Sequence, residues 1–172
     1  MPILLVWCIR LRKMAKLTIL GLDLSLTCPG FAVVEIRNGK PKLLESGIVK
    51  ASPKQSQVDK IKRIAAHLYR LKMDYEIDVV VRESGFVKHN RTTKILERVV
   101  GGVMVTLGGE IHEIPPTSIK KAVTGNGKAT KQEVEVAVRS LLNLPKDFRF
   151  KSDDESDSCA VALAFAILEG VV

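Results

Sequence analysis

Apolar residues recur along the chain at two different spacings, which together predict an α/β fold. Short runs of apolar and β-branched residues predict five strands, at 17–23, 30–36, 42–49, 77–82 and 110–114. Apolar residues three or four positions apart, with common capping residues, predict helices at 58–75, 91–106, 117–123, 130–142 and 152–168. Thr130 with Glu133, and Ser152 with Glu155, have the spacing of a capping box at the start of the last two helices.

The order of these elements predicts how the strands pair. Three strands come first, and Asn38-Gly39 between the second and third is typical of a tight hairpin. Strands and helices alternate afterwards, which favours parallel pairing. We therefore expect a mixed five-stranded sheet, antiparallel at one side and parallel at the other, flanked by helices in a single domain over 14–172.

Residues 1–13 differ from the rest of the chain. An apolar run comes first and three basic residues follow it, which is the reverse of the order in a secretory signal. We interpret this segment as an extension or a mis-called start before Met14. The alternative is an arm that touches a membrane or a partner.

The amino-acid composition narrows the classes of partner and of fold that the chain can have. Lys and Arg number 27 against 19 Asp and Glu, so the net charge is +8, and nucleic acid is the first candidate partner, ahead of an anionic membrane surface. No apolar run approaches the ~20 residues that span a bilayer. Three cysteines without metal-ligand spacing argue against a zinc finger and a disulfide scaffold, and indicate a reducing, cytoplasmic compartment.

Four acidic residues stand at positions that suggest chemistry. Asp23 and Glu83 each end a predicted buried strand, at the edge where α/β sheets place ligands. Asp154 and Asp157 are three residues apart, so they share one face of the last helix. Clustered carboxylates repel one another unless cations hold them, and hard oxygen ligands favour Mg²⁺ or Mn²⁺. A basic protein with such a pocket suits a polyanionic substrate, which predicts a metal-dependent nuclease.

Each acid also has an ordinary structural interpretation. Asp23 could form a turn, and Glu83 could be a surface residue at a strand end. Acids in the first turn of a helix complement its dipole, and we expect this role for Asp153 and Glu155.

The chain from about 16 to 170 resembles the RuvC family of Holliday-junction resolvases, in the ribonuclease H-like and retroviral-integrase fold. The matching segments are GLDLSLTCPGFAVVE, VVVRESGF, IPPTSIKKAVTGNGKATKQEVEVAVRSLLNLP and DESDSCAVALAFAI. The most specific feature is their order: a lysine, a Gly-x-Gly loop, a second lysine, an amphipathic helix, and D-x-x-D before an alanine-rich helix.

This resemblance implies roles for individual residues. Four acids match the catalytic, metal-binding carboxylates of the family: Asp23, Glu83, Asp154 and Asp157. Lys120 and Lys131 fall where the family has lysines near the scissile phosphate. Phe86 matches an aromatic residue that stacks on a base at the junction centre. The DNA-binding expectations also include Lys88, Arg91 and Lys128, while His89 is not expected to bind metal.

The same resemblance implies an activity and partners. We expect resolution of Holliday junctions or other branched DNA by two-metal-ion hydrolysis, leaving a 5′-phosphate and a 3′-hydroxyl. Mg²⁺ would be the cofactor, two ions per site, and Mn²⁺ a substitute. A symmetric junction predicts a homodimer, for which the helix with Ile95, Val99 and Val103 is the candidate seam. The alternatives are a ribonuclease H-like nuclease acting on structured RNA, and a non-catalytic binder of branched DNA.

Departures in the first motif, notably Pro29-Gly30, are more similar to phage- and virus-type members than to the bacterial enzyme. They leave open whether a branch-migration motor is a partner. A viral origin would make the relevant compartment that of the host cell.

Overall fold

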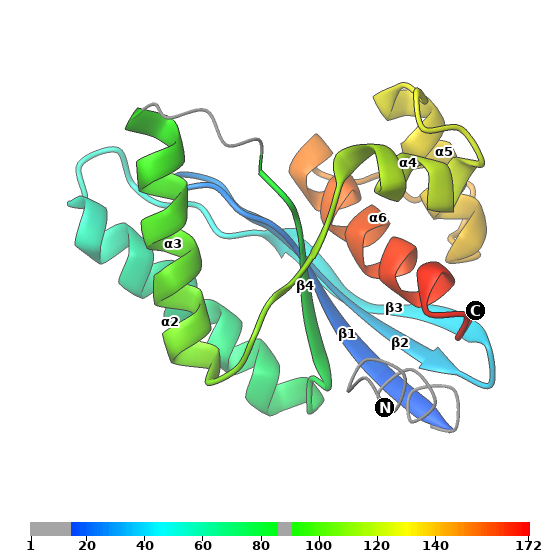
Figure 1. Cartoon of the computed structure of the whole chain (residues 1–172), viewed down its shortest axis with the longest axis horizontal. Coiled ribbons are helices and arrows are strands. Elements are labelled where there is room, and N and C mark those ends of the chain that lie inside the picture. Colours follow the sequence, from blue (N-terminus) through cyan, green and yellow to red (C-terminus); the bar gives the residue numbers. More distant parts are fainter. Residues whose placement is uncertain (1–14, 86–90) are drawn as a thin grey trace, which may run out of the picture.

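Five strands form one sheet in the order β3-β2-β1-β4-β5, and helices cover both of its faces (Figure 1). This computed structural model describes residues 15–85 and 91–172. The strands are β1 (Lys16–Asp23), β2 (Gly30–Arg37), β3 (Lys40–Ile48), β4 (Val79–Glu83) and β5 (His112–Ile114). The helices are α2 (Gln57–Tyr75), α3 (Arg91–Leu107), α4 (Pro116–Thr124), α5 (Lys131–Leu141) and α6 (Asp153–Leu168).

The pairing of the strands confirms the predicted mixed sheet. β1 and β2, and β2 and β3, are antiparallel, whereas β4 is parallel to β1 and β5 is parallel to β4. Asn38 and Gly39 both have positive φ, 52° and 74°, as the tight turn between β2 and β3 requires. The parallel pairing of β1 with β4 needs a crossover, and α2 supplies it.

Two hydrophobic clusters lie on opposite faces of the sheet. α2 buries one stripe of side chains and packs with α3 over the first face. α4, α5 and α6 cover the second face, where α6 lies between the sheet and the other two helices. Because α6 is enclosed from several sides, most of its residues are buried, and its apolar positions show no single stripe.

Two glycines allow α6 to lie directly on the strands. A Cβ on Gly21 would come within 2.2 Å of the carbonyl oxygen of Ser158, and a Cβ on Gly30 within 1.9 Å of that of Asp154. Real Cβ atoms do not approach backbone this closely. The first half of α6 therefore has its position fixed against β1 and β2 by backbone contact.

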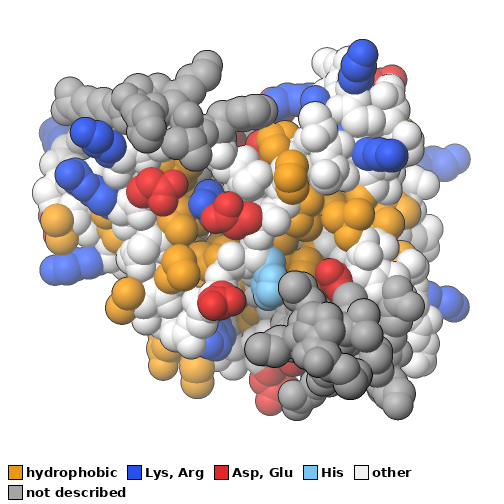
Figure 2. Space-filling view, viewed as in Figure 1, with side chains coloured by type: hydrophobic (Ala, Val, Ile, Leu, Met, Phe, Trp, Pro, Cys, Tyr) orange, Lys and Arg blue, Asp and Glu red, His pale blue; other side chains and the backbone are white. Residues whose placement is uncertain are grey.

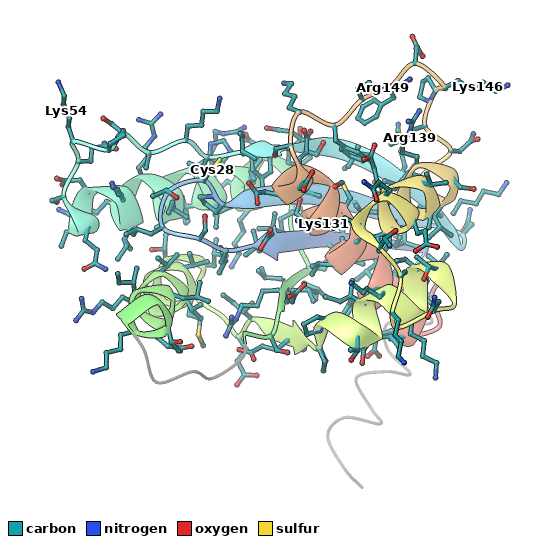
Figure 3. All side chains as sticks on the ribbon, turned by 90° about the horizontal axis from the view of Figure 1, so that it is seen from above. Cys28, Lys54, Lys131, Arg139, Lys146 and Arg149 are labelled. Atoms are coloured by element: carbon teal, nitrogen blue, oxygen red, sulfur yellow. The ribbon has the colours of Figure 1, made fainter. Side chains whose placement is uncertain are left out.

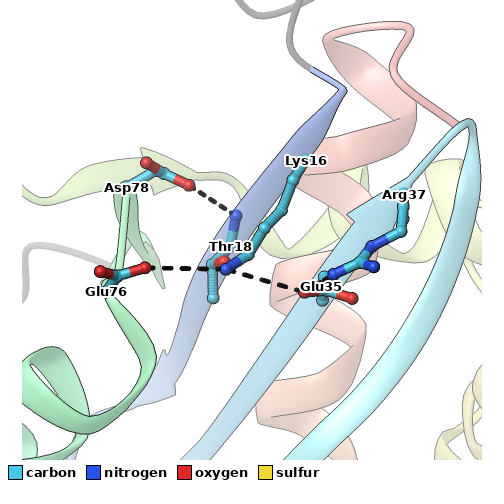
Figure 4. Close-up of polar contacts among 6 residues, drawn as sticks. All are labelled: Lys16, Thr18, Glu35, Arg37, Glu76 and Asp78. Carbon is cyan, nitrogen blue, oxygen red and sulfur yellow. Dashed lines mark hydrogen bonds and ion pairs between the residues drawn. The ribbon is translucent and has the colours of Figure 1, made fainter.

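Polar contacts anchor the start of β1, at the opposite end of the strand from Asp23 (Figure 4). The Thr18 amide donates to a carboxylate oxygen of Asp78 at 2.8 Å. Lys16 reaches Glu35 and Glu76, each at 3.9 Å. These contacts tie β1 to both neighbouring strands, so this edge of the sheet serves structure.

The structure corrects one expectation about a local feature and refines another. Ser152 caps α6 by accepting from the amide of Glu155, but the Glu155 carboxylate does not complete a capping box. It instead accepts from the Lys151 amide and the Ser46 hydroxyl, both at 2.7 Å, because it is buried against β3. Val99 and Val103 are fully buried in the core, so these two side chains face the sheet; the exposed apolar residues on the described part of α3 are Met104 and Val105, and the helix as a dimer seam stays a prediction.

Two further findings bear on expectations made from the sequence. The described part of the chain contains no helix long and apolar enough to cross a membrane. Residues 1–13 lie outside the described residues, so their interpretation as an extension or a mis-called start stays a prediction.

Candidate active site

Asp23 and Glu83 lie at the same edge of the sheet. β1 and β4 are neighbours and parallel, and their register pairs Leu22 with Arg82. The next residue of each strand is the acid, so both carboxylates come at the carboxyl ends of adjacent strands. Asp23 is half-buried, and Glu83, although more exposed to solvent, is partly desolvated.

The first turn of α6 brings two more acids to this edge. Gly30 pairs with Asp23 across β1 and β2, and the Asp154 backbone packs on Gly30. Asp157 follows one turn later and is half-buried, whereas Asp153 is exposed. The helix therefore carries Asp154 and Asp157 to the end of β1, as their spacing predicted.

The electrostatics link Asp23 to the other three acids. Burial, helped by the charges of Asp157, Asp154 and Glu83, raises the pKa of Asp23 to about 7. Burial and the charge of Asp157 likewise raise the pKa of Glu83, and burial raises that of Asp157. Asp153 is not among the groups that shift Asp23, which supports Asp154 as the member of this set. The catalytic role of the four acids stays a prediction.

Among the described residues, Lys131 is the cation that forms ion pairs at this edge. Its ammonium lies 3.2 Å from Asp153 and 3.3 Å from Asp157, and these contacts raise its pKa. It begins α5, and the predicted capping box is present there: Thr130 accepts from the Glu133 amide, and Glu133 accepts from the Thr130 amide. The cap thus fixes the start of the helix that presents Lys131 to the acids, near the middle of the view in Figure 3.

The other basic and aromatic candidates either form no ion pair with the acids or lie outside the described residues. Lys120 on α4 is half-buried, and its charge lowers the pKa of Glu83. Lys128 is exposed in the turn before α5. Phe86 and Lys88 lie outside the described residues, as does His89. Arg91 begins α3, but its side chain is outside the description too.

The acids fit a hard divalent cation by their chemistry. In the described part of the chain, no three His, Cys, Asp or Glu side chains already lie close enough to hold a metal ion. The four carboxylates nevertheless offer only oxygen ligands, which Mg²⁺ and Mn²⁺ prefer. Their mutual repulsion, visible in the raised pKa of Asp23, is what a cation would relieve.

Sequence reasoning missed two polar residues beside the site. Arg82, next to Glu83, is 5% exposed and binds Glu113 on β5 at 2.5 Å. Glu155, taken as a helix-dipole residue, is 4% exposed and joins α6 to β3. The run VVVRE places a charge in a buried strand, and this was the available signal for Arg82.

The chain as a whole is basic. Its net charge is +8. On the face shown in Figure 2, Lys and Arg side chains lie mostly around the edge, and Asp and Glu side chains lie nearer the middle. A polyanion is therefore attracted to the molecule although the site itself is acidic.

Comparison with known proteins identifies relatives over most of the chain. Residues 19–165 match the family model of crossover junction endodeoxyribonuclease RuvC. The protein of that name from Alkaliphilus metalliredigens is 34% identical over 152 residues, which are 86% of this chain and 92% of the relative. That from Aliarcobacter butzleri is 37% identical over 153 residues, covering 86% and 97%.

A solved structure agrees with this result. Thermus thermophilus RuvC, in complex with a Holliday junction substrate, superposes with a TM-score of 0.79 at 27% identity, covering 88% of this chain and 94% of that one. All three proteins are bacterial, and the expectation of a phage- or virus-type member stays a prediction. The fold, the placement of the acids and these matches lead to one conclusion: this chain belongs to the RuvC family of crossover junction endodeoxyribonucleases.

Proposed function

We propose that this chain cuts four-way DNA junctions as a divalent-metal-dependent endonuclease. The observation that carries the proposal is the convergence of four acids from β1, β4 and α6 at one sheet edge, beside Lys131. Relatives named for crossover-junction cleavage, and the Thermus structure with a Holliday junction substrate, support it.

The residues of the site divide into metal-holding and phosphate-facing groups. Two Mg²⁺ ions, or Mn²⁺ in their place, would be held by four acids: Asp23, Glu83, Asp154 and Asp157. When bound, the ions supply Lewis-acid activation of water for an in-line attack on the phosphodiester. Lys131 holds an ammonium beside the acids, where it stabilises negative charge developing on the phosphate oxygens. The products are a 5′-phosphate and a 3′-hydroxyl.

The symmetry of the substrate favours a homodimer. A four-way junction needs two symmetric cuts, and a two-fold dimer provides two sites in that relation. Exposed apolar side chains on α2 and α3 support this face as the seam: Tyr69, Met73 and Val105 are 48%, 61% and 84% exposed. A groove of about 580 Å³ runs beside Tyr69 and Val105 between the two helices. We propose that a second copy of the chain occupies it.

The dimer is tested by sedimentation velocity. Val105→Lys places a charge in the proposed seam and shifts the chain to a monomer. Val136→Lys on α5 changes a residue that is 67% exposed, away from that seam, and leaves the dimer intact. A parent chain that sediments as a monomer at all concentrations, with and without junction DNA, contradicts this assembly.

The cellular compartment also remains a proposal. Cys28 and Cys159 are free thiols. Free cysteines are typical of reducing compartments, which supports a cytoplasmic location.

Cleavage of defined nucleic acids tests the activity. A labelled synthetic four-way junction, a linear duplex of the same sequence and a structured RNA are incubated with the full chain, in Mg²⁺ or in EDTA. We expect paired nicks at symmetric positions in the junction alone, only with Mg²⁺, and ends that ligase can rejoin.

Two variants separate the site from the rest of the surface. Asp23→Asn removes one charge from the acidic cluster and abolishes cleavage, whereas Glu110→Gln removes a charge from an exposed acid between α3 and β5 and leaves it unchanged. Cleavage of the RNA alone would turn the proposal to the RNA nuclease. Tight junction binding without cutting in either metal would turn it to the non-catalytic binder.

A further inference from the structure

Two arginines from different elements converge beside the loop that leads into α6. Arg139 lies near the end of α5, and Arg149 lies in the loop itself. Both donate to one acceptor, the carbonyl oxygen of Lys146, at 2.8 Å from Arg139 Nη2 and 2.7 Å from Arg149 Nη1. Figure 3 shows the three side chains gathered around this loop.

The two guanidinium groups share this place without an ion-paired acid, although Asp147 lies on the same loop between Lys146 and Arg149. Within the described ranges, neither has a carboxylate oxygen within 4 Å, and neither do Lys146 and Lys151 on the same loop. Arg70 on α2 shows the usual arrangement, with Glu45 at 3.0 Å and Asp74 at 2.6 Å. Two like charges held together in this way favour an anion between or beside them.

The donors left over suit a phosphate. Among the residues that the structure describes, Arg139 donates only through Nη2 and Arg149 only through Nη1. Each guanidinium therefore has its Nε and its other Nη available. In Arg149 the free Nε and Nη2 form one edge, which can donate two parallel hydrogen bonds to a phosphate, as a lysine cannot. In Arg139 the free Nε and Nη1 point to different sides, so each donates a single hydrogen bond.

The loop is held in place before any ligand arrives. Arg139 also donates to the carbonyl oxygen of Pro145, and the rings of Phe148 and Phe150 pack edge to face at 5.0 Å. Phe150 packs against the core under α6. A binding surface that is already ordered loses little conformational freedom when it binds.

The position of the pair relates it to the active site. Arg139 follows Lys131 by eight residues on α5, so the two are about 12 Å apart along the helix and about 80° apart around it, within one broad side. In duplex DNA, one strand carries a phosphate every 3.4 Å along the axis. A duplex that runs along α5 from the acids thus presents a phosphate to the arginines about three to four base pairs from the cut.

We propose that Arg139 and Arg149 form a second phosphate-binding site, which grips the backbone of a junction arm about three to four base pairs from the scissile phosphate. The inference rests on the proposed function, because the distance is counted from its cut. It adds a contact that selects duplex arms of sufficient length, apart from the site of chemistry.

Single methylphosphonates in the DNA test this site. Each replaces one charged phosphate oxygen by a methyl group, so it removes one contact without changing the protein. Junctions modified at each position from one to six base pairs from the mapped cut are bound to the full chain in EDTA. We expect a loss of affinity of about ten-fold, roughly one charged hydrogen-bonded contact, confined to one or two positions near the third or fourth.

A matched pair of variants shows that the arginines make that contact. Arg139→Gln/Arg149→Gln binds the unmodified junction less tightly and loses no further affinity when the DNA carries the methylphosphonate. The slope of log affinity against log salt concentration is smaller in magnitude by about 1 to 2. Arg37→Gln/Arg70→Gln removes the same charge from exposed, ion-paired arginines and keeps both the parent slope and the parent response.

The outcomes distinguish the two proposals. If the parent binds and cuts the junction but no methylphosphonate within six base pairs weakens binding, the second site is wrong and the proposed function stands. If the parent neither binds nor cuts branched DNA, both are wrong. Because the methylphosphonate series uses the unaltered chain, a double variant that fails to fold does not affect its result.

Discussion

Replacing Gly30 by alanine tests whether the contact between α6 and β2 sets the geometry of the site. The new Cβ would lie 1.9 Å from the carbonyl oxygen of Asp154 and 2.5 Å from its carbonyl carbon. Ordinary contact begins at 3.4 Å, so the helix and the strand must separate by roughly 1.5 Å. Neither neighbouring atom belongs to a flexible side chain that could turn away.

The expected cost follows from this displacement. Overpacking of a close contact destabilises by about 1–3 kcal/mol. A shift of about 1 Å in a catalytic group costs about 100-fold in rate, and Asp154 moves with the helix. We therefore expect Gly30→Ala to unfold at lower urea concentration and to cut the junction at least 100-fold more slowly, well below its melting temperature.

Gly109→Ala, between α3 and β5, is the matched control. A Cβ there meets nothing within 4 Å, and Gly109 does not have a positive φ. This variant should be as stable as the parent and should cut at the parent rate. Both variants are measured by urea unfolding and by single-turnover cleavage with saturating protein.

One result would refute the reasoning. If Gly30→Ala loses stability but cuts at the parent rate while still folded, the close contact holds the fold but does not position Asp154. An unchanged midpoint of unfolding would show that the helix has room to move, contrary to the distances.

Three further predictions concern the acids and the helix that faces them. Lys131→Met should lower kcat about 100-fold in junction cleavage, while Lys121→Met, an exposed neighbour on α4, should not. The carboxyl of Asp23 has a pKa of 3.8 in the unfolded chain and of about 7 in the folded chain, so between these pH values only the folded chain keeps the proton. The free energy of unfolding of the metal-free protein therefore falls as pH rises through this window, by about 4 kcal/mol at most. Asp23→Asn should flatten that decline in urea unfolding and should also lose part of the stabilisation that Mg²⁺ gives the parent. Thr130→Ala should cost about 1 kcal/mol of unfolding free energy and Thr130→Ser little, because only serine keeps the cap of α5.

The regular elements could be predicted because their signals are local. Alternation and three-to-four spacing depend on neighbouring residues. The positive φ values of Asn38 and Gly39 follow from their own types, because asparagine tolerates this conformation and glycine has no Cβ to oppose it. The carboxyl ends of neighbouring parallel strands lie at the same edge of a sheet, so Asp23 and Glu83 could be expected close together from the sequence.

Other features depend on contacts between distant parts of the chain. Gly30 and Asp154 touch across more than a hundred residues, and no pattern near either one shows it. Glu155 looks like an ordinary first-turn acid until its contact with Ser46 is seen. Arg139 lies on an amphipathic helix whose spacing indicates only a polar face, so its convergence with Arg149 could not be foreseen.

The long separation between α6 and the strands it packs on has a consequence for protein synthesis. This helix packs on β1 and β2, yet it leaves the ribosome more than a hundred residues after them. A growing chain thus carries Asp23 and Glu83 for a long time without Asp154 and Asp157. Folding of α6 and assembly of the four acids are then a single event, and a fragment that stops before α6 lacks half of the set.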